Sequence, residues 1–243
     1  MKKFPSAKEI VEEAARSIST NVDINELHYA TYNLMKKYRE EYYKSKVKDF
    51  LSRPNIVKSL NPQTEVLLIK EMLKPLIIAD KNGQKEYSNF MEEASRRISQ
   101  IFQVISGNIA ELCIEKKLVE EGLVPGTHYL RKNKRSDFTF YHPNIKASDD
   151  THRVEVKNVK LRERAVRGLS FDGDSLVGFF DEPSEFSKST LDIINKHCVK
   201  NRGYCYVPLD VLNIISSKLS VKRFKSNKEF AKDMVKFVHT GII

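Results

Sequence analysis

The spacing of apolar residues changes along the chain, from intervals of three and four positions to strict alternation. In the first half the apolar positions recur at helical spacing, most clearly from Phe90 to Leu112, where they form one continuous stripe. This stripe predicts a long amphipathic helix that ends at Gly122 and Pro125. After Asp137, apolar and polar residues alternate in short runs, which is typical of strands.

Further helices are predicted in the amino-terminal part of the chain. The first spans residues 6–17, and the second begins at Asp23, where Glu26 completes a capping box. A third helix is expected to begin at Asn61-Pro62, because Asn can cap a helix and Pro suits its first turn. Its helical pattern carries apolar residues as far as Leu76.

Tyrosines lie among lysines on the second of these helices, at Tyr29, Tyr32, Tyr38, Tyr42 and Tyr43. Such rings can stack on unpaired bases beside basic side chains. An aromatic stripe on a helix is more often an interface with other elements, and we favour that interpretation.

A turn signal at Asp80-Lys81-Asn82-Gly83 separates two parts of the chain. We therefore expect a helical N-terminal region over residues 1–84, used for dimerisation or DNA contact, and a second domain over residues 85–243. In the second domain we expect strands at 137–141, 153–159, 175–181 and 204–207, and helices that open at Pro183 and at Ser226 with Glu229. These elements predict a mixed α/β fold with a small central mixed sheet flanked by helices.

The first two of these strands are expected to pair as an antiparallel hairpin around the polar loop 143–150. Side chains alternate between the two faces of a strand. One face of the hairpin therefore carries four apolar side chains and should be the core: Phe138, Phe140, Val154 and Val156. A slip by one residue would exchange the faces, so these residues fix the register.

The opposite face of the hairpin carries Asp137, Glu155 and Lys157. A near-symmetric register places Asp137 across from the end of the second strand that holds Glu155 and Lys157. Two carboxylates so close repel each other, and Mg²⁺, which prefers oxygen ligands, relieves that repulsion. A metal held there could bind a scissile phosphate and activate a water, while Lys157 orients that water.

Asp137 followed by Glu155-Val156-Lys157 resembles the signature of the PD-(D/E)XK nucleases, which include most type II restriction endonucleases. The order of elements is also similar over roughly residues 87–207, although Ser136 stands where the family has a proline. The resemblance implies a Mg²⁺-dependent, site-specific endonuclease for double-stranded DNA. It further implies products with a 5′-phosphate and a homodimer that acts on a palindrome.

In many members of this family an acidic residue on the helix before the hairpin joins the metal site. The resemblance offers Glu111 for this role, with Glu115 one turn later as a substitute. The alternative is that Glu111 is a surface residue of an amphipathic helix. Gly107 lies one turn before Glu111 on the same face, and we expect it to let the helix approach the sheet.

Two basic segments next to the hairpin are expected to bind DNA. The segment before the hairpin suits the positioning of phosphates and consists of Arg131, Lys132, Lys134 and Arg135. The segment after it consists of Lys160, Arg162, Glu163, Arg164 and Arg167. Its Arg-Glu-Arg triplet could read a G·C pair, and contact with phosphates alone is the alternative.

Composition supports a polyanionic partner and excludes several classes of protein. The formal net charge is +10 and the isoelectric point is near 9.3, a balance that favours nucleic acid. Three cysteines without a paired metal-ligand spacing predict reduced, mostly buried thiols, and no zinc pattern is present. No Gly-rich phosphate loop is found, so no nucleotide cofactor is expected. Without an apolar signal or membrane-length segment, we expect a cytoplasmic protein.

Two other functions remain open at this stage. In the first, the protein has the same fold but is a structure-selective nuclease, such as a Holliday-junction resolvase or a repair enzyme. The second is a non-catalytic, sequence-specific DNA-binding protein, in which Glu155 and Lys157 are an exposed pair on one strand. Such a protein would bind DNA with a steep salt dependence and would not cut it with any divalent metal.

Overall fold

The computed structural model of the chain describes residues 4–18, 22–51, 76–80, 83–87, 90–133, 136–158, 173–180, 183, 186–216 and 222–243. The chain divides into two units, which are described separately below. One comprises Met1–Ser6 and Asn33–Ser106, and the other comprises Ala7–Tyr32 and Gly107–Ile243. The proposed domains, residues 1–84 and 85–243, stay a prediction.

Three helices lie where the sequence predicted helices: α1 (Ala7–Ser17), α2 (Ile24–Leu51) and α5 (Phe90–Glu120). The capping box before α2 is confirmed, because Asp23 Oδ1 accepts from the backbone N of Glu26 at 3.1 Å. In return, Glu26 Oε2 accepts from the backbone N of Asp23 at 3.0 Å. These bonds satisfy backbone donors that a helix start leaves open.

In the unit with residues 33–106, a hairpin joins β1 (Leu76–Asp80) to β2 (Gly83–Tyr87). The two strands meet where the turn was expected, with Asp80 opposite Gly83. The expectation that the helical pattern extends to Leu76 is wrong, because Leu76 begins a strand. A short apolar run with β-branched residues before an Asn-Gly turn favours a hairpin. The expected helix start at residues 61–62 lies outside the described residues.

Aromatic packing in the same unit confirms part of the predicted tyrosine interface. The ring of Phe4 contacts Tyr42 at a centroid distance of 5.8 Å, Tyr38 at 6.4 Å and Phe102 at 5.2 Å. Arg39 places its guanidinium 4.9 Å from the Phe102 ring. The stripe is not uniform, since Tyr29, which belongs to the other unit, is 70% exposed.

The larger unit is built on a six-stranded sheet in the order β3-β4-β5-β6-β7-β8. Its strands are β3 (Tyr129–Asn133), β4 (Ser136–His142), β5 (Asp150–Asn158), β6 (Ser175–Phe179), β7 (Cys205–Val207) and β8 (Phe224–Ser226). β3, β4 and β5 pair antiparallel, whereas β5 to β8 pair parallel. The predicted mixed sheet is confirmed.

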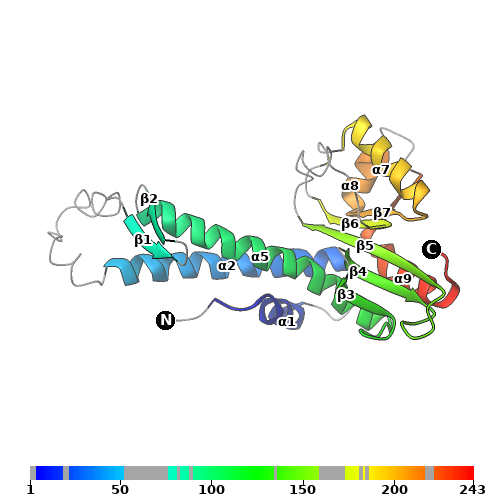
Figure 1. Cartoon of the computed structure of the whole chain (residues 1–243), viewed down its shortest axis with the longest axis horizontal. Helices are drawn as coiled ribbons and strands as arrows, with labels where there is room; N and C mark the ends of the chain where they lie inside the picture. The colour runs from blue at the N-terminus through cyan, green and yellow to red at the C-terminus, as the bar shows by residue number, and fades with distance from the viewer. Residues whose placement is uncertain are drawn as a thin grey trace. The chain divides into compact units, whose positions relative to one another are not determined.

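Helices cover both faces of this sheet (Figure 1). They include α7 (Lys188–Lys200), α8 (Leu209–Ser216) and α9 (Asn227–Thr240). One core cluster joins α5 and α9 to the face that carries Phe138, Val154 and Val177. A second joins α7 and α8 to the opposite face, through Leu176 and Cys205. β6 contributes to both clusters, so it is buried on both faces.

Some elements differ from the sequence-based expectation. β3, α8 and β8 were not predicted, and β8 has three residues, too few for an alternating pattern to be visible. The helix expected at Pro183 begins instead at Lys188, because Ser187 is its cap and accepts from the backbone N of Thr190. The capping box of Ser226 and Glu229 at α9 is confirmed.

All three cysteines are buried and free of disulfides, as their number and spacing predicted. Burial raises the pKa of Cys113 to about 12, and that of Cys198 to about 12, so both stay protonated at neutral pH. Among the described residues, no helix is both long enough and apolar enough to cross a membrane.

Two histidines are held in the core as neutral side chains. The His28 ring stacks on Phe179 at a centroid distance of 4.0 Å, and the His152 ring lies 5.3 Å from Phe237. The Nε2 atom of His152 is 2.8 Å from the Ser175 hydroxyl. Burial lowers the pKa of His28 to about 4 and that of His152 to about 4. Both therefore resist protonation in the folded protein.

This burial predicts a loss of stability in acid. The unfolded histidines accept protons below about pH 6.5, while the folded ones remain neutral until about pH 4. Stability is therefore complete above pH 6.5 and falls as the pH drops, by about 2 kcal/mol per histidine at pH 5. Urea unfolding at pH 7 and pH 5 should show a smaller loss in His152→Gln than in the wild type. Replacement of the exposed His239 by Gln should leave the loss unchanged; an equal loss in all three proteins would contradict this account.

Candidate active site

The β4–β5 hairpin has the register that the sequence predicted. Phe138 pairs with Val154, and one further pair in the same register would place Asp137 opposite Glu155. Phe138 and Val154 are completely buried, and Val156 packs against the same cluster. The apolar face therefore points into the core, and the residues between these positions point to the other face of the sheet.

Asp137 lies where the regular pairing of β4 with β5 ends. Its Oδ2 accepts a hydrogen bond from the backbone N of Val156 at 2.7 Å. A carboxylate thus takes the place of a backbone carbonyl as partner of β5. This bond holds the Asp137 carboxylate against the strand that carries Glu155 and Lys157.

Glu155 and Lys157 follow on the same face of β5 and form an ion pair. Lys157 Nζ lies 3.0 Å from Glu155 Oε2. The Glu155 side chain is 14% exposed and that of Lys157 is 41% exposed. The carboxylate is therefore largely enclosed, while the amine can reach a ligand in solvent.

Gly178 on β6 is the strand neighbour of Lys157, and no pattern in the sequence marks it. The ring of Phe180 lies over Gly178 and occupies the place that a Cβ would take. Phe180 is also part of the core cluster on this face. The glycine and the ring together place an apolar surface beside the amine of Lys157.

Glu111 of α5 lies near this site but is already engaged by cations. It is 8% exposed, with its Oε2 3.2 Å from Arg131 Nε and 3.6 Å from Lys132 Nζ. Burial raises its pKa; Lys132 and Arg131 oppose the rise, and Asp137 adds to it. The interaction with Asp137 shows that the two carboxylates are close enough to repel each other. The surface interpretation of Glu111 is wrong, because its side chain is buried.

The second carboxylate on this part of α5, Glu115, also binds Arg131, with Oε2 2.8 Å from a terminal guanidinium nitrogen. Arg131 therefore bridges two glutamates one turn apart. Gly107 does not have the role that its position suggested, because a Cβ there would meet nothing within 4 Å. The expectation that Gly107 lets the helix approach the sheet is wrong.

Ser136, which stands where the PD-(D/E)XK nucleases have a proline, is buried and helps to join β3 to β4. Its hydroxyl donates to the backbone O of Asn133 at 2.8 Å and lies 2.8 Å from the Thr139 hydroxyl. A serine can thus fix the chain immediately before Asp137 without the rigid ring of proline.

Only two of the predicted DNA-binding residues are described, and both are on β3. Arg131 and Lys132 lie beside Glu111, on the edge strand of the sheet. The other predicted residues lie outside the described part of the chain: Lys134, Arg135, Lys160, Arg162, Glu163, Arg164 and Arg167.

The residues of the hairpin fit a hard cation by their chemistry. The donors are carboxylate oxygens with a lysine beside them, and the buried Glu111 Oε2 makes no hydrogen bond of good geometry. Within the described ranges, no three His, Cys, Asp or Glu residues are grouped as a complete metal site. Mg²⁺ is commonly held by one or two carboxylates, with waters and a substrate phosphate as further ligands. Asp137 and Glu155 satisfy that minimal requirement.

Comparison with known proteins identifies the fold. No protein-family model and no curated protein matches the sequence. The chain has the restriction-endonuclease-like fold of the PD-(D/E)XK nucleases. Two solved structures of metal-depleted Ecl18kI, a type II restriction endonuclease, share this fold. One is a complex with uncleaved, modified DNA and the other is a complex with uncleaved DNA. The TM-scores are 0.63 and 0.60; each match has 12% identity and covers 97% of this chain and 79% of that chain.

Proposed function

We propose that this protein is a Mg²⁺-dependent type II endonuclease that cuts double-stranded DNA at specific sites. One observation carries the proposal: the β4–β5 register brings Asp137, Glu155 and Lys157 together within a restriction-endonuclease-like fold. The two Ecl18kI structures that share this fold are complexes with DNA, and a net charge of +10 suits the same partner.

Asp137 and Glu155 would hold the metal, which supplies charge stabilisation to the phosphate and acidity to a bound water. The bond from the backbone N of Val156 keeps the Asp137 carboxylate oriented. Glu111 is the third ligand that we propose. It becomes available when Arg131 and Lys132 turn from it toward DNA phosphates.

Lys157 would act on the water and on the scissile phosphate. Its ammonium group, held near Glu155, can orient an attacking water and balance phosphate charge. The water oxygen forms the new bond to phosphorus, and the bond to the 3′-oxygen breaks. The product then carries the phosphate on its 5′ end.

Sequence recognition and symmetry belong to the same proposal. The Arg162-Glu163-Arg164 triplet would read bases in the major groove. Arg131, Lys132 and the remaining basic residues near the hairpin would contact phosphates. A homodimer would place one such site on each strand of a palindromic sequence, since a two-fold axis relates both the subunits and the half-sites.

The decisive experiment is incubation of the protein with phage DNA at low salt, with Mg²⁺ or with a chelator. We expect discrete fragments with 5′-phosphate ends in Mg²⁺ and intact DNA with the chelator. A synthetic four-way junction is digested in parallel. Cleavage of the junction alone would identify a structure-selective nuclease. Binding without cleavage in both Mg²⁺ and Mn²⁺ would refute the nuclease proposal and favour a non-catalytic DNA-binding protein.

A further inference from the structure

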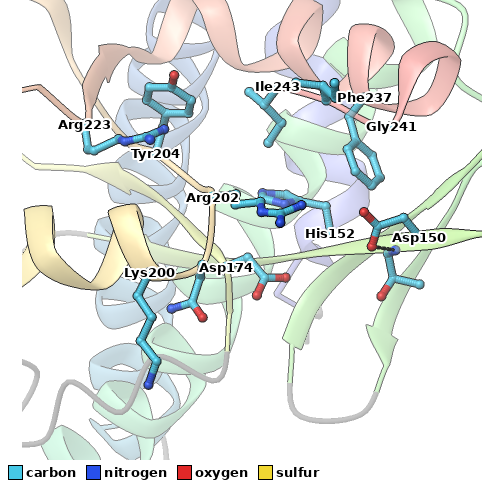
Figure 2. A pocket seen from close by; sticks show the side chains of 13 residues that line it. Asp150, His152, Asp174, Lys200, Arg202, Tyr204, Arg223, Phe237, Gly241 and Ile243 are labelled. Carbon is cyan, nitrogen blue, oxygen red and sulfur yellow. Dashed lines mark hydrogen bonds between the residues drawn. The ribbon is translucent and has the colours of Figure 1, made fainter.

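A cavity of about 610 Å³ lies where the parallel strands β5 to β8 begin. Figure 2 shows its labelled residues, which include His152 of β5, Asp174 just before β6 and Arg223 just before β8. Its volume is within the usual range of about 300–1,000 Å³ for small-molecule sites. The cavity therefore has room for a ligand of nucleotide size.

The cavity is separate from the candidate active site. His152 precedes Glu155 by three residues on β5, which corresponds to about 10 Å along a strand. The two side chains also belong to opposite faces, because His152 alternates with Arg153 and shares the face of Val154. A ligand in the cavity would thus not compete with DNA at Glu155.

Three cationic residues line the cavity, Lys200, Arg202 and Arg223. Among the residues that the structure describes, none of the three forms an ion pair with a carboxylate. Unpaired cations around a hollow attract an anion and, as donors, can bind its oxygens.

The surroundings hold the Arg223 side chain and the backbone of Arg202 in place. Arg223 Cζ lies 5.0 Å from the centre of the Tyr204 ring, and its backbone N donates to Asn195 Oδ1 at 3.2 Å. Arg202 has φ of 55° in the turn between α7 and β7. The next residue must be glycine, because a Cβ on Gly203 would collide with the backbone of Asp174. The Arg223 side chain and the backbone turn at Arg202 are consequently in place before any ligand arrives.

Carboxylates also line the cavity, but much of their charge is already compensated. Asp174 accepts from the backbone N of Arg153 at 2.7 Å and pairs with its guanidinium at 3.4 Å. Asp150 Oδ1 accepts from the backbone N of Thr151 at 2.7 Å. The three cationic side chains outnumber the two carboxylates, and the second oxygen of Asp150 can still accept from a hydroxyl or amino group.

The wall toward α9 is apolar. Phe237 of α9 and the following residues Ile242 and Ile243 line this side, as Figure 2 shows for Phe237 and Ile243. Inorganic phosphate alone would leave most of the volume and this apolar wall without contact. A phosphate attached to a ring-bearing body would contact both the cationic side chains and this apolar wall.

We propose that this cavity binds a phosphate ester of nucleotide size, with its phosphate at Arg202 and Arg223 and its ring toward Phe237. The phosphate can come from a free nucleotide or from a nucleic-acid strand. The proposal does not depend on nuclease activity, because it uses none of the residues of the candidate active site.

Binding of deoxyadenosine 5′-monophosphate to the full chain tests this proposal by calorimetry, with a chelator present. Inorganic phosphate and a 12-base-pair duplex without terminal phosphates are the other two probes. The double variant Arg202→Gln, Arg223→Gln removes both guanidinium groups. The variant Lys232→Gln, Lys236→Gln removes the same charge from exposed positions on α9 and is the matched control.

We expect the nucleotide to bind more tightly than inorganic phosphate, and the arginine variant to lose about 10- to 100-fold in affinity. The lysine control should bind as the wild type does. If only nucleotide binding falls, the ligand is a free nucleotide. If duplex binding falls in the arginine variant but not in the control, the phosphate is that of a nucleic-acid strand.

Unchanged affinities for all probes in an arginine variant that unfolds at the wild-type temperature would overturn the proposal. Equal losses in both double variants would also overturn it, because they would show an effect of net charge alone. The single variant Phe237→Leu, which keeps a buried apolar side chain, tests the ring site separately. It should weaken nucleotide binding while leaving inorganic phosphate binding unchanged.

Discussion

The Glu155→Gln protein is expected to cut DNA about 1,000-fold more slowly than the wild type, or not at all. Gln keeps the size of the side chain but removes the charge that would hold a divalent cation. The Glu155 side chain is only 14% exposed, so water cannot replace the lost carboxylate charge and its second oxygen without rearrangement. Lys157→Met should cause a loss of similar size, because it removes the amine beside the reacting groups and keeps its apolar stem.

Measurements of unfolding temperature and of DNA affinity distinguish a loss of catalysis from a loss of structure in these two variants. Both variants should unfold at nearly the wild-type temperature, since each removes one partner of an ion pair with a partly exposed lysine. Their affinity for a duplex should fall by less than tenfold in the presence of Ca²⁺. The double variant Glu155→Gln, Lys157→Met should be no slower than the worse single variant if the two groups act as a unit.

A matched control comes from an ion pair of the same composition on α5. Lys116 Nζ lies 3.6 Å from Glu120 Oε1, and both side chains are about two-fifths exposed. Glu120→Gln and Lys116→Met should therefore leave cleavage unchanged. Rapid cleavage by Glu155→Gln and Lys157→Met would place the active centre elsewhere in the protein.

The part of the site that lies within one hairpin could be predicted from the sequence. Alternation alone placed Phe138 and Val154 on one face and Asp137 and Glu155 on the other. This worked because a strand has a side-chain period of two, and only one register buries the aromatic residues. The bond from Val156 N to Asp137 could not be predicted, since it requires the pairing to end at that residue.

Features that depend on several distant segments could not be predicted. Glu111 was an open choice between a metal ligand and a surface residue, because its burial depends on how α5 meets β3. The cavity brings together the starts of four parallel strands, and no local pattern marks such a meeting point. Short elements such as β8 were missed for a related reason. Three residues cannot show a period, and their strand conformation comes from pairing with β7.

Phe138→Ala is expected to lower the free energy of unfolding by about 3–5 kcal/mol, the usual cost of removing a buried phenyl ring. Phe138 is fully buried, and its ring centroid lies 5.9 Å from that of Tyr129 and 6.2 Å from that of Phe140. The cavity left behind would open in the cluster that joins β4 to α5 and α9. Urea unfolding in a chelator measures the loss apart from any metal.

The effect of Phe138→Ala on stability is best compared with that of a substitution at Asp137, the preceding residue on β4. Asp137→Asn should abolish cleavage but change the free energy of unfolding by about 1 kcal/mol or less, because the amide oxygen can still accept from Val156 N. Tyr29→Ala, at a ring that is 70% exposed, should cost less than about 0.5 kcal/mol. Adjacent residues on one strand would then divide their effects between folding and catalysis, as alternation between the two faces requires. A Phe138→Ala protein as stable as Tyr29→Ala would show that the aromatic face does not fix the hairpin. Burial of that face would then not be what brings Asp137 close to Glu155.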